Sequence, residues 1–126
     1  MRHSILVVDD NPLNLKLFTY LLAVPGYDVS TARNAEEALQ VLVQLKPQLI
    51  LMDLQLPDID GLTLTRRLKQ DPTLRATAIV AVTASAMKGD EEKARAAGVD
   101  GYMTKPLEKR AFRAMVERYL TREEAR

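Results

Sequence analysis

The chain has 126 residues, of which 47% are hydrophobic, so it is long enough for one domain with a buried core and too apolar to be disordered. Its 18 Lys and Arg residues face 17 Asp and Glu residues. The resulting net charge of +1 argues against a nucleic-acid-binding protein, which would carry a clear basic excess. The absence of cysteine excludes disulfides, thiolate catalysis and cysteine-based zinc sites.

The start of the chain offers no targeting or membrane signal. Met-Arg-His-Ser is followed only by a short apolar run, whereas a membrane span needs about 20 apolar residues and a signal peptide needs a longer apolar region with a cleavage site. We therefore expect a cytoplasmic protein without membrane contact. Because no repeat or Pro/Ser-rich linker interrupts the sequence, we expect a single domain over residues 1–126, with no separate output domain.

Five short runs rich in β-branched residues predict strands. They are Ile5–Val8, Val29–Ala32, Leu49–Met52, Ile79–Val82 and, more weakly, Gly101–Met103. Three of these runs are continuously apolar, which a sheet buried on both faces requires.

Helical stretches follow the first three strand runs, and each begins at a recognisable cap. Asn11 precedes a proline and opens a stretch with leucines at helical spacing. Asn34 and Glu37 form a capping-box pattern for a second helix. The pair Asp60-Gly61 opens a third helix, which ends near Asp71 because a proline follows it.

Two more helices are predicted towards the end of the chain. The fourth covers about Met87–Ala97 and ends at Gly98, a residue suited to a helix C-terminus. The fifth follows Pro106 and carries an apolar stripe over about Leu107–Leu120. The alternation of strands and helices predicts an α/β protein of the (βα)5 type, with a doubly wound five-stranded parallel sheet in the flavodoxin-like order 2-1-3-4-5.

Polar residues follow four of the predicted strands. Asp9 and Asp10 come after the first strand, Asp53 after the third, Thr83 after the fourth and Lys105 shortly after the fifth. The carboxyl ends of parallel strands meet at one edge of the sheet, so these side chains should converge near the switch point of the fold. Each residue alone has an ordinary explanation as a turn, cap or surface residue, and only their joint placement indicates a site. The single histidine, His3, is expected to be an exposed terminal residue.

The chemistry of this set favours phosphoryl transfer. Two carboxylates about 4 Å apart repel by about 4 kcal/mol at an effective dielectric of about 20. Mg²⁺ relieves such repulsion, prefers carboxylate and carbonyl oxygens and also binds phosphate oxygens. With Lys105 and the Thr83 hydroxyl beside it, Asp53 would be a nucleophile held in a clamp for a phosphoryl group.

Five motifs together resemble the receiver domains of bacterial two-component response regulators, over essentially the whole chain. They are Val7–Asn11, Leu51–Pro57, Asp60-Gly61, Val82–Ala84 and Tyr102–Pro106. Pro57 and the segment Ala81–Glu91 look closest to stand-alone DivK-type regulators and to receivers attached to hybrid histidine kinases.

The resemblance implies a role for each matching residue. Asp53 would be the phosphoacceptor, and Asp9 and Asp10 would hold Mg²⁺, with Mn²⁺ as a substitute, together with Asp53 and the backbone carbonyl of Gln55. Lys105 would bind the phosphoryl group with its ammonium, and the peptide bond between Lys105 and Pro106 would be cis. Thr83 and Tyr102 would be the switch residues, of which Tyr102 is expected to turn inward on activation.

The implied function is a signalling switch that catalyses only its own phosphorylation and slow dephosphorylation. Its phosphodonor would be a sensor histidine kinase or a histidine phosphotransferase, docking near Asn14–Tyr20. A downstream protein would read the face formed by the fourth helix, the fifth strand and the fifth helix. We also expect a monomer or weak dimer, and the nearly balanced charge predicts no nucleic-acid partner.

Two other classes remain as alternatives. A phosphohydrolase with an Asp nucleophile would usually carry a second Asp two residues further on, where this chain has Gln55. A flavodoxin-like electron carrier would need a Ser/Thr-rich phosphate loop after the first strand, where Asp9 and Asp10 would repel the flavin phosphate.

Overall fold

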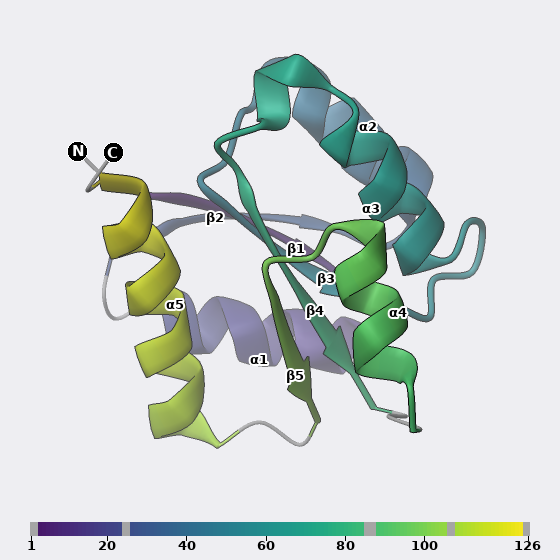
Figure 1. Cartoon of the computed structure of the whole chain (residues 1–126). Helices are drawn as coiled ribbons and strands as arrows, with labels where there is room; N and C mark the ends of the chain where they lie inside the picture. Colours follow the sequence, from purple (N-terminus) through teal and green to yellow (C-terminus); the bar gives the residue numbers. More distant parts are fainter. Residues whose placement is uncertain (1–2, 24–25, 85–87, 106–107, 125–126) are drawn as a thin grey trace.

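A five-stranded parallel sheet forms the centre of the molecule in this computed structural model, which describes residues 3–23, 26–84, 88–105 and 108–124 (Figure 1). The strands are β1 (Ser4–Val8), β2 (Asp28–Ala32), β3 (Leu49–Asp53), β4 (Ala78–Thr83) and β5 (Gly101–Thr104). Their order is β2-β1-β3-β4-β5, and every neighbouring pair is parallel. The predicted doubly wound sheet is therefore confirmed.

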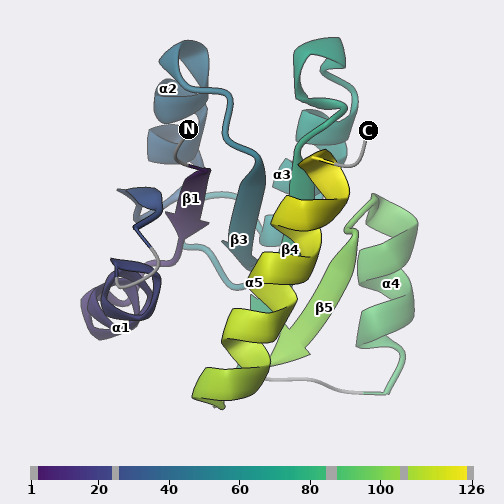
Figure 2. The same ribbon diagram turned by 90° about the vertical axis from the view of Figure 1, so that its left-hand side faces the viewer.

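Helices cover both faces of the sheet (Figures 1 and 2). They are α1 (Pro12–Ala23), α2 (Ala35–Gln44), α3 (Gly61–Lys69), α4 (Asp90–Ala97) and α5 (Lys109–Glu124), with a short 3₁₀ helix at Pro72–Leu74. The helices α1 and α5 pack on one face, and α2, α3 and α4 pack on the other. Among the described residues, no helix combines the length and the apolar character needed to cross a bilayer.

The sheet separates two apolar cores, and this explains why its central strands are continuously apolar. In β1, Ile5 and Val7 pack with α1 and α5, whereas Leu6 and Val8 pack with α2, α3 and α4. Alternate side chains of a strand point to opposite faces, so both positions must be apolar when both faces are covered.

The helix starts follow local capping chemistry. The Asn34 side chain accepts a hydrogen bond from the Glu37 backbone N–H, and the Asp60 side chain accepts one from Thr63, as their sequence patterns predict. The start of α4 differs from the prediction. It begins at Asp90 because Gly89 has a φ of 91°, which helical backbone cannot adopt; Met87 lies outside the described residues. The helix α5 also extends further than predicted, since it ends at Glu124 and not near Leu120.

Candidate functional site

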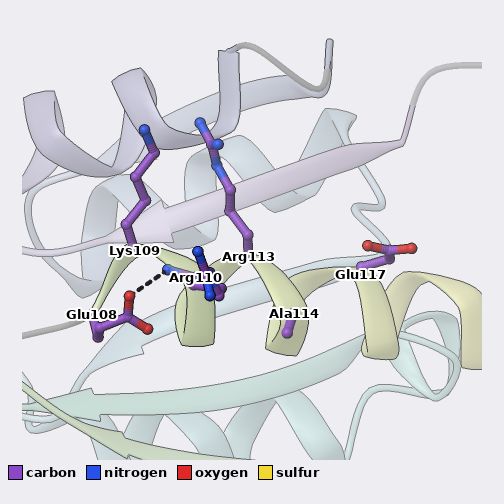
Figure 3. Close-up of a pocket in the computed structure, with 6 residues that line it drawn as sticks. All are labelled: Glu108, Lys109, Arg110, Arg113, Ala114 and Glu117. Atoms are coloured by element: carbon purple, nitrogen blue, oxygen red, sulfur yellow. Dashed lines mark hydrogen bonds between the residues drawn. The ribbon is translucent and has the colours of Figure 1, made fainter.

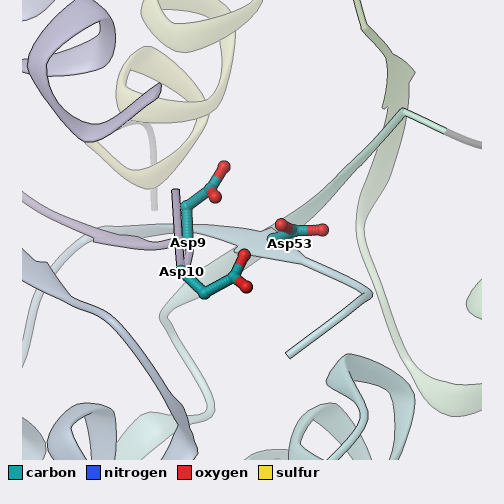
Figure 4. Close-up of side chains that lie close together, drawn as sticks. All are labelled: Asp9, Asp10 and Asp53. Carbon is teal, nitrogen blue, oxygen red and sulfur yellow. The ribbon is translucent and has the colours of Figure 1, made fainter. Parts of the chain in front are cut away.

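Three carboxylates lie together at the carboxyl edge of the sheet (Figure 4). Asp9 and Asp10 follow β1, Asp53 is the last residue of β3, and each offers an oxygen within 4.8 Å of the others. Asp9 is 1% exposed and Asp53 is 7% exposed, whereas Asp10 is open to solvent. Two of the three charges are therefore poorly screened by water, and the cluster needs positive charge nearby.

Lys105 supplies that positive charge from the residue directly after β5. Its Nζ lies 2.8 Å from Asp9 Oδ2 and 3.7 Å from Asp53 Oδ2, with the lysine side chain only 15% exposed. The single ammonium therefore lies near two buried carboxylates and is closer to Asp9 than to Asp53. The structure brings together Asp9, Asp10, Asp53 and Lys105 as the sequence predicts.

Asp9 is held by more groups than the sequence indicated. The Asn11 backbone N–H donates to Asp9 Oδ1 at 2.9 Å, and the Asn14 side-chain amide donates to Oδ2 at 3.3 Å. Asn14 was missed as a site residue because it stands within the apolar repeat of α1, and only the position of that helix against β1 shows the contact.

Asp53 is placed in an environment that favours its neutral form. Burial raises the pKa of its carboxyl above the ordinary value, and the negative charge of Asp9 raises it further. The Gln55 backbone N–H, which donates to Asp53 Oδ1 at 3.0 Å, and the Lys105 ammonium both oppose this increase. A cation bound at this edge of the sheet would therefore favour the ionised form of Asp53.

Gly61 allows the loop after β3 to close over Asp53. A Cβ at this position would lie 2.5 Å from the Asp53 carbonyl oxygen and 2.7 Å from Leu54 Cα, so no larger residue fits without moving the backbone. The Gly61 N–H donates to the Leu54 carbonyl at 3.0 Å, and this hydrogen bond holds the start of α3 against the end of β3. In the sequence Gly61 reads only as part of a helix start, although the path of the loop after Asp53 depends on it.

Two further predicted site residues lie on the neighbouring strands, Thr83 as the last residue of β4 and Tyr102 as the second residue of β5. Thr83 is 3% exposed, and its carbonyl accepts a hydrogen bond of 2.8 Å from the Lys105 backbone N–H.

Tyr102 is half-buried and packs against the core formed with α2, α3 and α4. Its hydroxyl is covered and has no hydrogen-bond partner among the described residues. Burial, together with the charges of Asp90 and Glu91, raises the Tyr102 pKa. Pro106, predicted to follow a cis bond, lies outside the described residues.

Two surface hollows differ in their relation to this cluster. A small pocket of about 210 Å³ adjoins the site and is lined by Leu54, Gln55, Asp60, Leu62, Thr83 and Asp90. A larger groove of about 550 Å³ runs along residues 108–117 of the α5 region, where Lys109 and Arg113 extend from the helix (Figure 3). The larger groove contains none of the clustered carboxylates, so it is separate from the site.

The donor set fits a hard divalent cation. Carboxylates within 4.8 Å of one another, one of them exposed, match the oxygen ligands and retained waters that Mg²⁺ prefers. The chain has no cysteine, and its only histidine, His3, directly precedes β1, so neither thiolates nor imidazoles are available to this cluster. His3 is not the exposed residue that the sequence predicted, because it is half-buried and forms a hydrogen bond with the Gln48 side chain. The fold and these side chains define a flavodoxin-like domain with a carboxylate cluster at the carboxyl edge of its sheet.

Comparison with known proteins places this domain in a family. The family model for the response regulator receiver domain matches residues 5–117. The chain therefore belongs to the response regulator receiver family of two-component signalling. It is 45% identical to the polar-differentiation response regulator DivK of Brucella anthropi over 120 residues, which cover 95% of this chain and 98% of that protein.

Solved structures agree with the sequence comparison. A CheY-like receiver domain protein from Methanospirillum hungatei is similar, with a TM-score of 0.92 and 27% identity over 99% of this chain and 98% of the other. The receiver domain of a sensor histidine kinase from Pseudomonas aeruginosa, described with a magnesium ion coordinated in its active-site cleft, has a TM-score of 0.87 and 30% identity over 96% of this chain and 99% of the other. Receiver domains bind Mg²⁺ at an acidic pocket, and Asp9, Asp10 and Asp53 form such a cluster here.

Proposed function

We propose that this chain is a phosphorylation-dependent switch in which Asp53 accepts a phosphoryl group from a phosphohistidine. The donor is a sensor histidine kinase or a histidine phosphotransferase. One observation carries this proposal: the Lys105 ammonium lies between Asp9 and Asp53, 2.8 Å from one carboxylate and 3.7 Å from the other, at an acidic edge that fits Mg²⁺. A nucleophilic carboxylate beside a lysine and a metal site is suited to phosphoryl transfer.

In the transfer, an Asp53 carboxylate oxygen forms a bond to phosphorus while the bond from phosphorus to the donor's imidazole nitrogen breaks. The electron pair of that bond stays on the nitrogen, and because the other ring nitrogen of the phosphohistidine already carries a proton, the donor leaves as neutral imidazole. Lys105 pairs with a phosphoryl oxygen, and the Thr83 hydroxyl donates to another. Asp9, Asp10, Asp53 and the Gln55 carbonyl would hold Mg²⁺, which supplies positive charge opposite the phosphoryl oxygens when bound.

The phosphodonor docks on the outer face of α1. Leu13, Leu17 and Tyr20 are 73%, 46% and 64% exposed, although they are large and apolar. Residues at this spacing form one stripe along a helix, and the helix begins directly beside the carboxylate cluster. An exposed apolar stripe suits a protein partner that brings its phosphohistidine to Asp53.

The output is a change in affinity for a protein partner at the face formed by α4, β5 and α5. The Thr83 and Tyr102 side chains act together as the switch: movement of Thr83 towards the phosphoryl group alters the packing of Tyr102 on the neighbouring strand. The domain is a single receiver unit, a monomer or weak dimer without a nucleic-acid partner. It catalyses no reaction beyond its own phosphorylation and slow dephosphorylation.

Labelling with a small phosphodonor tests the acceptor. Acetyl phosphate and Mg²⁺ should label the wild type at Asp53, and Asp53→Asn should remove the label. Asp71→Asn, which changes a carboxylate at the start of the short 3₁₀ helix, is the matched control and should label normally. Full labelling of Asp53→Asn would exclude the assignment.

Beryllofluoride, which mimics an aspartyl phosphate, tests the output face by NMR. Shift changes should extend from Asp53 to Tyr102, α4 and α5. Changes confined to the surroundings of Asp53 would show that this protein does not signal through that face.

A further inference from the structure

Two side chains donate to one oxygen of Asp9, and they come from opposite ends of the chain. Lys105 Nζ lies 2.8 Å from Asp9 Oδ2, and Asn14 Nδ2 lies 3.3 Å from the same atom. The lysine contact has the ordinary length of a charge-assisted hydrogen bond, whereas the amide contact is longer than most N–H···O bonds. Lys105 therefore occupies the better position on Oδ2, and the Asn14 bond has room to shorten.

Lys105 has a second carboxylate within reach. Its Nζ is 3.7 Å from Asp53 Oδ2, so a short movement of the ammonium would take it from Asp9 to a phosphoryl oxygen attached to Asp53. That movement removes the strongest donor from Asp9. Asp9 is 1% exposed, and a buried carboxylate that loses a donor without replacement is strongly destabilised.

We propose that Asn14 is a positioning residue that takes over Asp9 Oδ2 when Lys105 moves to the phosphoryl group. This inference rests on the proposed function, since it concerns the state in which Asp53 carries a phosphoryl group. The amide is neutral, so its hydrogen bond to Asp9 adds no charge beside a bound cation. Its hydrogen bond contributes more in the phosphoryl-bearing state than in the resting state.

The Asn14 side chain is not needed to cap or to stabilise the start of α1. The start of α1 is already capped by Asn11, whose side chain accepts from the Leu13 N–H and whose carbonyl accepts from the Leu15 N–H. Inside a helix, leucine is a better helix former than asparagine. Within the described residues, the contact with Asp9 is the one hydrogen bond of the Asn14 side chain, and it explains a polar residue at this position.

Binding of beryllofluoride tests the inference without phosphoryl transfer. In Asn14→Leu, the affinity for beryllofluoride at saturating Mg²⁺ should fall about tenfold, the effect of losing one hydrogen bond to a charged group. Affinity for Mg²⁺ alone, followed by NMR titration, should change much less because Lys105 then still occupies Asp9. Asn14→Gln keeps the amide and should recover part of the lost affinity.

Thr19→Leu is the matched control, because it exchanges a polar for an apolar residue on α1, about one and a half turns nearer its C-terminal end. Its beryllofluoride affinity should equal that of the wild type. The inference is overturned if Asn14→Leu binds beryllofluoride normally, or if it loses Mg²⁺ and beryllofluoride affinity equally. Failure of the proposed function is a different outcome, in which the wild type itself neither binds beryllofluoride at Asp53 nor is labelled there.

Discussion

Replacing Lys105 by Met should strongly destabilise the metal-free protein. At an effective dielectric of about 20, one ammonium gains about 6 kcal/mol from Asp9 at 2.8 Å and about 4.5 kcal/mol from Asp53 at 3.7 Å. Much of this gross attraction offsets the cost of taking the three groups out of water. The net loss on removing one member of a buried ion pair is about 3–5 kcal/mol. Because Lys105 is 15% exposed, we expect the lower end, about 3 kcal/mol.

Urea unfolding followed by circular dichroism, in the presence of EDTA, measures this loss directly. For a domain of this size a loss of about 3 kcal/mol corresponds to a fall of about 10 °C in melting temperature. Lys93→Met, at an exposed lysine of α4, is the matched control and should change stability by less than about 0.5 kcal/mol. Addition of Mg²⁺ should stabilise Lys105→Met more than the wild type, since the cation replaces the missing charge.

A double mutant separates the charge effect from packing. If the lysine acts by neutralising Asp9, then Asp9→Asn should recover part of the stability lost in Lys105→Met. A Lys105→Met protein within about 0.5 kcal/mol of the wild type in EDTA would refute this electrostatic account of the cluster.

Four further results are expected from the same unfolding measurements. Asp10→Asn should raise the stability of the metal-free protein by relieving repulsion and should weaken its stabilisation by Mg²⁺; an unchanged Mg²⁺ response would remove Asp10 from the site. Gly61→Ala should cost about 1–3 kcal/mol and slow labelling of Asp53, because the added Cβ meets backbone atoms. Tyr102→Phe should stabilise the protein by about 1 kcal/mol, since it removes a buried hydroxyl that has no partner among the described residues; a loss of stability would reveal a bond to that hydroxyl. Because burial raises the pKa of Asp53, its ionised form opposes folding at neutral pH, so metal-free Asp53→Asn should be the more stable protein there. This advantage should shrink as the pH falls through the raised pKa, and a constant difference across that range would contradict the assigned cause.

The sheet and the acidic cluster were predictable because both depend on features that are local in sequence. Apolar runs define the strands, and parallel strands necessarily bring their carboxyl ends to one edge, so Asp9, Asp53 and Lys105 had to approach one another. Residues far apart in the chain could therefore be assigned to one site before any distance was known.

Contacts that depend on how separate elements pack could not be predicted in this way. The Asp58 side chain accepts hydrogen bonds from the Ala35 and Glu36 N–H groups, so a residue of the loop after β3 caps α2 from 22 and 23 positions away. Asn14 likewise reads as a polar interruption of an apolar helix until α1 is placed against β1. The late start of α4 depends on the left-handed backbone of Gly89, and the sequence shows only that a glycine is present there.

The backbone anchor of Lys105 would allow its side chain to change partners, as proposed, without disturbing the sheet. Its backbone N–H donates to the Thr83 carbonyl at 2.8 Å, one position beyond the pair formed by Thr83 and Thr104. The end of β4 and the base of the lysine are therefore joined, while the ammonium at the far end of a flexible side chain lies between two carboxylates. A phosphoryl group that attracts both the ammonium and the Thr83 hydroxyl would act on two residues linked by this backbone bond. Under the proposed function, the charge at Asp53 and the packing of Tyr102, which pairs with Ala81 two residues before Thr83, would be parts of one equilibrium.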